Sequence, residues 1–327
     1  MSPSSGGAKA AWVFPGQGSQ TVGAGRDLYE ASRAARSVFE RADAVLGFPL
    51  THLCFEGPEA ELTRTVNAQA AIMAVSLACL AAAQEAGILG PPHVGGQGPA
   101  FVAGHSLGEY TAIVAAGALT MEEGLRLVRE RGRLMQEAGE RTPGTLAAIL
   151  GMEEGALLEV CRRTGAEVCN LNAPGQVVIG GSHDAVAAAV REALAAGARR
   201  AIELQVTGAF HTSLMRPAVE GMRRALAEVD LRDPQVPLVA NVSGRPLTDA
   251  EELTDELIHQ LDHPVQWQRS VEYMSGQGVA SFAEIGPGRV LTGLIRRIAP
   301  EAQVWNIDGQ ASIEAARPSG GLPGTRP

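Results

Sequence analysis

Residues 104–109, Gly-His-Ser-Leu-Gly-Glu, lie between an apolar run at 100–103 (AFVA) and an alanine-rich stretch at 107–117 (LGEYTAIVAAG). The first stretch favours a strand and the second a helix, so Ser106 is expected where a strand turns sharply into a helix. Glycines at 104 and 108 complete the pattern G-x-S-x-G, because so tight a turn strains the serine backbone and crowds its neighbours. The pattern indicates a nucleophile elbow whose Leu107 amide faces developing negative charge. A glycine-flanked structural turn is the alternative that this stretch leaves open.

The same order of strand, glycine-containing loop and helix occurs near the start of the chain. Residues 11–14 (AWVF) predict a strand, residues 15–20 (PGQGSQ) a loop, and a helix is expected from about Asp27. This repetition predicts a largely parallel sheet flanked by helices, with functional residues at the carboxyl ends of the strands. The early loop has neither GxGxxG nor Walker A spacing, so we do not expect a nucleotide site there.

Residues 142–206 have a different element order. The sequence predicts a strand at 145–150, a helix at 153–164, strands at 167–171 and 176–180, a helix at 183–196 and a strand at 200–206. This β-α-β-β-α-β order is the split βαβ pattern of a ferredoxin-like unit. Pro143-Gly144 and Thr207-Gly208 are candidate hinges at its ends.

The predicted fold class is therefore α/β, with a large α/β-hydrolase-like domain that contains a parallel sheet and carries an inserted ferredoxin-like small domain. The large domain is expected to be discontinuous, over residues 10–141 and 207–307, and the small domain to span 142–206. A cleft between them would lie beside the chain that follows residue 207. Residues 1–9 and 308–327 are expected to be flexible, since the tail has few apolar side chains to pack.

Composition indicates a soluble globular protein, since 45% of the 327 residues are hydrophobic and can form a sizeable core. The net charge of −9 argues against nucleic-acid binding, which requires a concentrated basic surface. The longest apolar stretch, residues 70–83, is shorter than the roughly 18 residues of a membrane span, so we expect a buried helix. The start MSPSSGGAKA has no signal-peptide or transit-peptide character. Cys54, Cys79, Cys161 and Cys169 show neither a CxxC pair nor a histidine at metal-ligand spacing, so no metal site is expected. They are best explained as reduced thiols in the core, which predicts a cytoplasmic location.

A serine hydroxyl needs a nearby base, and His211 is the strongest candidate among the seven histidines. His105 is adjacent to Ser106 in sequence, and neighbouring side chains point apart. His211 follows Gly208-Ala209-Phe210 at the predicted domain junction and precedes a predicted helix at 212–228. The amino-terminal dipole of that helix disfavours an imidazolium and would keep the base neutral.

An arginine occurs within the apolar face of a predicted helix at 121–138. Leu127, Val128, Leu134 and Met135 share this face, and Arg131 falls between the two pairs. We therefore expect its guanidinium to point inward, where an unpaired charge would cost roughly 3–5 kcal/mol. The partner is either a structural Asp or Glu or a substrate carboxylate, which the planar guanidinium can bind through two hydrogen bonds.

Several motifs together resemble one family over residues 11 to 300. They are PGQGSQ, GHSLGEYTA, the arginine 25 residues after the serine, GAFHTSLM, NVSGRPLTD, HPVQW and EIGPGRVLTGLIRRI. In this order they closely resemble the malonyl-CoA:acyl carrier protein transacylases, which load malonyl units for fatty acid synthesis. The family is similar to the acyltransferases that serve polyketide synthases.

The resemblance implies a role for each matching position. Ser106 would take the malonyl group from coenzyme A as an ester, with His211 as general base and then general acid. The family orients this histidine through a backbone carbonyl, which matches Gln260. Gln17 and Leu107 would supply the oxyanion-hole amides. Arg131 would bind the malonyl carboxylate.

The same resemblance implies the substrate and the partner. Phe210, beside the base, would crowd a branched α-carbon and so favour malonyl over methylmalonyl. Malonyl-CoA is the expected substrate, no bound cofactor is expected, and discharge goes to the phosphopantetheine thiol of an acyl carrier protein or of a polyketide synthase carrier domain. Such carriers are acidic, so a basic docking rim is expected at Arg199, Arg200, Arg296 and Arg297.

Other functions remain as alternatives. A trans-acting polyketide synthase acyltransferase would use the same residues. A related enzyme that hydrolyses acyl groups on carrier proteins is a closer alternative. Loss of the inward arginine would favour it, but Arg131 is present. A simple esterase would need an acid between serine and histidine, where Asp184 is the weak candidate. A non-catalytic scaffold leaves the pairing of Ser106 with His211 unexplained.

Overall fold

The computed structural model describes residues 9–92 and 98–316. The strands of this part are β1 (Lys9–Phe14), β2 (Phe101–Gly104), β3 (Thr145–Leu150), β4 (Glu167–Ala173), β5 (Gln176–Gly181), β6 (Arg200–Leu204), β7 (Leu238–Val239), β8 (Pro246–Leu247), β9 (Val279–Ile285) and β10 (Gln303–Ile307). The helices up to the second sheet are α1 (Arg26–Ala31), α2 (Arg33–Leu46), α3 (Leu50–Glu56), α4 (Glu59–Thr63), α5 (Thr65–Glu85), α6 (Leu107–Ala115) and α7 (Met121–Arg141). The later helices are α8 (Glu154–Thr164), α9 (His183–Ala195), the 3-10 helix η1 (Ser213–Met215), α10 (Arg216–Ala227), α11 (Ala250–His259), α12 (Trp267–Gly276), α13 (Val290–Ile298) and α14 (Gln310–Ala316).

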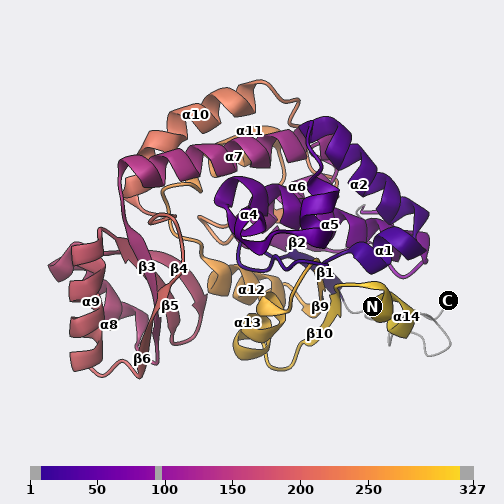
Figure 1. The fold of residues 1–327 in the computed structure, drawn as a ribbon. Coiled ribbons are helices and arrows are strands. Elements are labelled where there is room, and N and C mark those ends of the chain that lie inside the picture. Colours follow the sequence, from indigo (N-terminus) through magenta and orange to yellow (C-terminus); the bar gives the residue numbers. More distant parts are fainter. Residues whose placement is uncertain (1–8, 93–97, 317–327) are drawn as a thin grey trace, which may run out of the picture.

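The larger of two sheets has six strands in the order β10-β9-β1-β2-β7-β8. The first five run parallel and β8 is antiparallel to β7. Helices lie on both sides of this sheet (Figure 1), as the alternation of strands and helices in the sequence predicts. The carboxyl ends of β1 and β2 therefore meet at one edge, and both predicted glycine-containing loops begin there.

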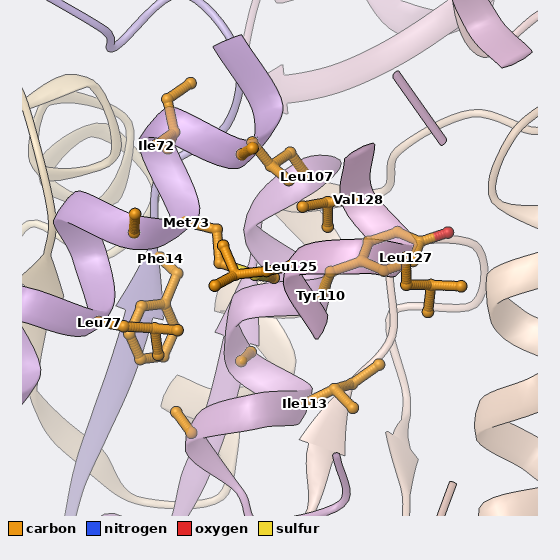
Figure 2. Close-up of a cluster of buried hydrophobic side chains, with 14 of the residues drawn as sticks. Phe14, Ile72, Met73, Leu77, Leu107, Tyr110, Ile113, Leu125, Leu127 and Val128 are labelled. Carbon is orange, nitrogen blue, oxygen red and sulfur yellow. The ribbon is translucent and has the colours of Figure 1, made fainter. Parts of the chain in front are cut away.

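The main hydrophobic core holds α5, α6 and α7 against the strands. Figure 2 shows Leu107 and Tyr110 of α6 beside Met73 of α5 and Leu125 of α7, and all four side chains are buried in one cluster. Burial of each such side chain contributes about 1.5–3 kcal/mol. This packing fixes the start of α6, where Ser106 lies, relative to the inward face of α7.

Helix α5 contains the longest apolar stretch of the chain. Within the described residues it is the helix long and apolar enough to cross a membrane, yet 89% of its most apolar window is buried inside the structure. The prediction of a buried helix at 70–83 is therefore confirmed, with wider bounds.

The second sheet has four antiparallel strands in the order β4-β5-β3-β6. Helices α8 and α9 cover one face through a separate core, and this layer lies to one side of the larger sheet (Figure 1). The element order is the predicted β-α-β-β-α-β. The backbone of β4 also pairs with Val265, which donates to Cys169 at 2.8 Å while Leu171 donates back at 2.8 Å. The small sheet is thus attached to the larger body along β4 as well as through its two connections.

The predicted flexible ends need correction. Lys9 is the first residue of β1 and pairs with Val279. Residues 310–316 form α14, whose Ile313 is buried in the main core and whose first amide, at Gln310, donates to Asp27. Residues 1–8 and 317–327 lie outside the described part of the chain.

The cysteines follow the prediction. Cys54, Cys79, Cys161 and Cys169 are free and buried. Burial raises the pKa of each thiol, to about 12 for Cys54 and about 11 for Cys161, so these side chains are protonated near neutral pH.

Candidate active site

Ser106 lies between β2 and α6 with φ of +52° and ψ of −107°, an unfavourable conformation for a residue with a side chain. The flanking glycines allow the turn because the backbones approach closely. A Cβ at Gly104 would lie 1.9 Å from the carbonyl carbon of Gly108, and a Cβ at Gly108 would lie 2.0 Å from the carbonyl oxygen of Phe14. The predicted reason for both glycines is confirmed.

His211 is brought to this serine from 105 residues further along the chain. Its Nε2 lies 2.7 Å from Ser106 Oγ, and its Nδ1 lies 2.7 Å from the backbone carbonyl oxygen of Gln260. A carbonyl oxygen can only accept, so Nδ1 donates, and Nε2 of the neutral ring is free to accept the serine proton. The three groups form the hydrogen-bonded chain that a general base and its orienting group require.

The charge state of His211 has a different main cause from the one the sequence indicates. Burial first, and then the positive charge of Arg131, lower the pKa of His211 to about 3. The expected helix at 212–228 is a 3-10 turn followed by α10, so the helix proper begins five residues after His211. The imidazole is neutral, but burial and a neighbouring cation are the reason.

Arg131 points inward from α7, as the apolar face predicts, and is 1% exposed. Its guanidinium donates to Gln69 Oε1 at 2.8 Å, Gln260 Oε1 at 2.7 Å and Ser106 Oγ at 3.1 Å. Its Nε has no hydrogen-bond partner among the described residues.

The alternative of a structural ion pair is not found, since none of the ion pairs within residues 9–92 and 98–316 includes Arg131. The guanidinium instead lies 5.1 Å from the centroid of the Tyr110 ring, a cation–π contact. The hydrogen-bond partners of Arg131 are neutral; burial lowers its pKa, and the buried Glu109 carboxyl raises it only through a coulombic interaction. A buried cation whose hydrogen-bond partners are neutral is suited to an anionic ligand.

Behind Ser106 lies a polar network that sequence reasoning did not single out. Asn241 Oδ1 accepts from the Ser106 amide at 2.7 Å, and Gln260 Nε2 donates to the Ser106 carbonyl at 2.9 Å. Both amide side chains also donate to Glu109, which is 0% exposed. Glu109 and Asn241 belong to the motifs GHSLGE and NVSG, and Gln69 is polar within an apolar helix. Gln69 could therefore have been predicted to point inward, because Arg131 was predicted to do so as a polar side chain on an apolar helix face.

The expected oxyanion-hole residues lie at the two loops that follow β1 and β2. Leu107 is the first residue of α6, so its amide has no intrahelical acceptor. Gln17 is in the loop after β1, which packs against the elbow: a Cβ at Gly16 would lie 2.4 Å from the carbonyl oxygen of His105. Phe210 precedes His211 and is 6% exposed within the main core.

The four arginines expected to dock a carrier protein are exposed, and two of them, Arg199 and Arg297, lie near the β4–β5 turn. Arg199 lies against Gly151, whose amide donates to Gly175 in the β4–β5 turn. Arg297 donates to the carbonyl of Pro174 in the same turn at 2.8 Å and to Gln176. Arg297 is thus engaged in joining α13 to the small sheet. In the described residues Arg199, Arg200 and Arg296 form no ion pair.

The sequence predicts no part for His105 in activating Ser106, and it makes Asp184 only a weak candidate for a triad acid. His105 Nε2 donates to Asn172 Oδ1 of β4 at 2.8 Å, so its ring contacts the small sheet, as expected for a side chain that points away from Ser106. Asp184 is exposed at the start of α9. The position of an acid beside His211 Nδ1 is taken by the Gln260 carbonyl.

A serine hydrogen-bonded to a neutral histidine at the end of a parallel strand, with a buried arginine at its hydroxyl, defines the class of serine-dependent acyl-transfer proteins. The chain belongs to the acyl transferase domain family, which its residues 11–312 match. The names of its relatives specify the acyl group and the acceptor. It is 42% identical over 313 residues to the malonyl CoA-acyl carrier protein transacylase of Bacillus subtilis (strain 168), covering 94% of this chain and 96% of that protein.

Solved structures agree with this assignment. The acyl-carrier-protein-S-malonyltransferase from Bartonella henselae is similar with a TM-score of 0.89 and 42% identity, covering 94% of this chain and 98% of that one. A type II PKS acyl-carrier protein in complex with its malonyl-transacylase also matches, with a TM-score of 0.89, 39% identity and coverage of 95% and 100%.

Proposed function

We propose that this protein transfers the malonyl group of malonyl-CoA to the phosphopantetheine thiol of an acyl carrier protein through a malonyl-Ser106 intermediate. The observation that carries the proposal is Arg131, a buried cation without an ion-pair partner in the described residues, 3.1 Å from the nucleophile. The names of the relatives and of the complex with an acyl-carrier protein support the same substrate and partner.

The chemistry follows from the hydrogen bonds at Ser106. His211 Nε2 takes the hydroxyl proton as Oγ attacks the thioester carbonyl, and the amides of Gln17 and Leu107 stabilise the oxyanion. The bond to sulfur breaks, and the His211 proton passes to the coenzyme A thiolate. The carrier thiol then repeats these steps in reverse order, which makes the reaction ping-pong. The Gln260 carbonyl keeps the His211 ring oriented throughout.

Arg131 selects the acyl group by charge and by reach. The carboxylate of a malonyl ester is separated from Oγ by only two carbon atoms, so a guanidinium that already contacts Oγ suits a short diacid. Binding of the carboxylate gives Arg131 an anionic hydrogen-bond partner and holds the ester in one pose for the thiol. Phe210 is proposed to exclude a methyl branch at the α-carbon.

We also propose that the two sheets are the cores of two domains. The large sheet and its elbow support an α/β-hydrolase-like domain, and the strand order of the small sheet supports a ferredoxin-like insert at 142–206. We propose that exposed Arg199, Arg200 and Arg296 receive an acidic carrier and that the protein works in the cytoplasm without a bound cofactor. A trans-acting polyketide synthase acyltransferase or a related acyl hydrolase is the alternative.

The test is direct. The protein is incubated with malonyl-, methylmalonyl- and acetyl-CoA, and intact mass identifies any acyl adduct before candidate carrier proteins are added. A malonyl adduct that is absent from Ser106→Ala and passes to a carrier is the expected result. No adduct on the wild type, or an equal adduct on Ser106→Ala, excludes the function. Loss of the adduct to water at the rate of its transfer to carrier would favour the hydrolase.

A further inference from the structure

Glu109 lies behind the nucleophile without contacting the atoms that react. It is on α6, three residues after Ser106, and is 0% exposed. Its Oε1 accepts from the backbone amide of Asn241 at 2.7 Å and from Asn241 Nδ2 at 3.0 Å, and its Oε2 accepts from Gln260 Nε2 at 2.5 Å. Three N–H groups thus converge on one carboxylate.

These contacts help to decide which way two amide side chains face, together with the Gly104 and Ser106 carbonyls, which also accept from Asn241 Nδ2 and Gln260 Nε2. An amide presents NH2 on one side and oxygen on the other, whereas an ionised carboxylate can only accept. Because Glu109 takes the NH2 groups of both Asn241 and Gln260, both amide oxygens must face away from it. The Asn241 oxygen then accepts from the Ser106 amide, and the Gln260 oxygen accepts from Arg131 at 2.7 Å.

We propose that Glu109 is the positioning residue of this site: by accepting from Asn241 and Gln260 it orients the two amides that hold the Ser106 backbone and the Arg131 guanidinium. Ser106 is held in a strained conformation, and Arg131 has neutral partners, so each depends on an oxygen of correct orientation. One carboxylate therefore couples the nucleophile to the group that selects the acyl chain. This inference rests on the proposed malonyl transfer.

A neighbouring carboxyl allows Glu109 to keep its accepting role. Glu256 is 8% exposed and lies beside Glu109, and burial raises the pKa of both carboxyls. Two adjacent buried negative charges are avoided when the pair holds one proton. We place that proton on Glu256, because both oxygens of Glu109 already accept N–H groups from Asn241 and Gln260.

The test compares Glu109→Gln with a matched variant, Glu284→Gln. Glu284 is also 0% exposed and accepts four hydrogen bonds, from the amides of Leu291 and Thr292, the Thr292 hydroxyl and Asn306, with no contact to the site. A glutamine at 109 can accept on one side only, so one of the two amides must turn or lose its partner. Thermal melting measures the structural cost of each variant.

Malonyl loading of Ser106 should fall about 30-fold or more in Glu109→Gln. The ratio of malonyl to acetyl loading should fall as well, because Arg131 loses its Gln260 anchor. Glu284→Gln should melt at a lower temperature but load close to the wild-type rate and with the wild-type ratio. Equal loading rates and ratios in the two variants would overturn the proposal.

Glu109→Asp covers the case in which Glu109→Gln does not fold. Aspartate can only accept, as glutamate does, but it is one methylene shorter and cannot reach both amides. The malonyl-to-acetyl ratio of Glu109→Asp should therefore be lower than that of the wild type and higher than that of Glu109→Gln, if the latter folds. A wild-type rate and ratio in Glu109→Asp would refute the positioning role.

An uncharged fluorophosphonate that labels Ser106 separates this inference from the proposed function. If the wild type does not load malonyl, the function is wrong, yet labelling still reports on the serine and its base. Slower labelling of Glu109→Gln than of Glu284→Gln then supports positioning of Ser106, and equal labelling contradicts it.

Discussion

Replacing Arg131 with glutamine is expected to lower the ratio of malonyl to acetyl loading of Ser106 about 150-fold. Two charge-assisted hydrogen bonds to a carboxylate contribute about 3–6 kcal/mol together. Part of this is offset because Arg131 gives up its 3.1 Å contact with Ser106 Oγ, and rearranges around Gln260, when the carboxylate binds. A net difference of about 3 kcal/mol corresponds to roughly 150-fold in kcat/KM.

Acetyl-CoA provides the comparison because it carries the same thioester and lacks the carboxylate. The rates of adduct formation on Ser106 with the two substrates are measured by rapid quench and intact mass. A malonyl-to-acetyl ratio that stays at the wild-type value in Arg131→Gln would show that the guanidinium does not bind the substrate carboxylate. Its buried charge would then need another explanation.

Three further predictions concern the base, the acyl pocket and the docking surface. Since burial and Arg131 lower the pKa of His211 to about 3, labelling by an uncharged probe should persist below about pH 5. The unfolded chain takes up a proton at His211 below its ordinary pKa and the native protein does not, so this group should make urea stability fall as pH decreases from about 6.5. A pH dependence of labelling with a midpoint near 6.5 would contradict this. Phe210→Ser should gain methylmalonyl loading, seen by intact mass, and a variant that gains none refutes the steric role of Phe210. Charge reversal at Arg199 and Arg296 should slow transfer to carrier while leaving loading from malonyl-CoA intact, and unchanged transfer kinetics would exclude this docking surface.

Much of the fold follows from local pattern. The strand, tight turn and helix around Ser106 were predictable because steric crowding at the elbow requires glycine at both 104 and 108, a constraint that acts between near neighbours. The small sheet was also predictable in element order, since its alternating strands and helices are short and well separated. The tail at 310–316 was predicted wrongly because one buried side chain, Ile313, and the distant Asp27 cap supply its stability.

The sequence by itself determined the chemistry that this protein holds: a serine at an elbow, a histidine after a junction and an arginine on an apolar helix face. Each depends on covalent geometry or on helical periodicity, which are local. Only the tertiary structure decided that the pKa of His211 is lowered by burial and Arg131, and that Glu109 orients the amides of Asn241 and Gln260. Those effects arise between residues that are 80 or more positions apart. At such separations, distance and the exclusion of water, rather than sequence spacing, set the strength of an electrostatic interaction.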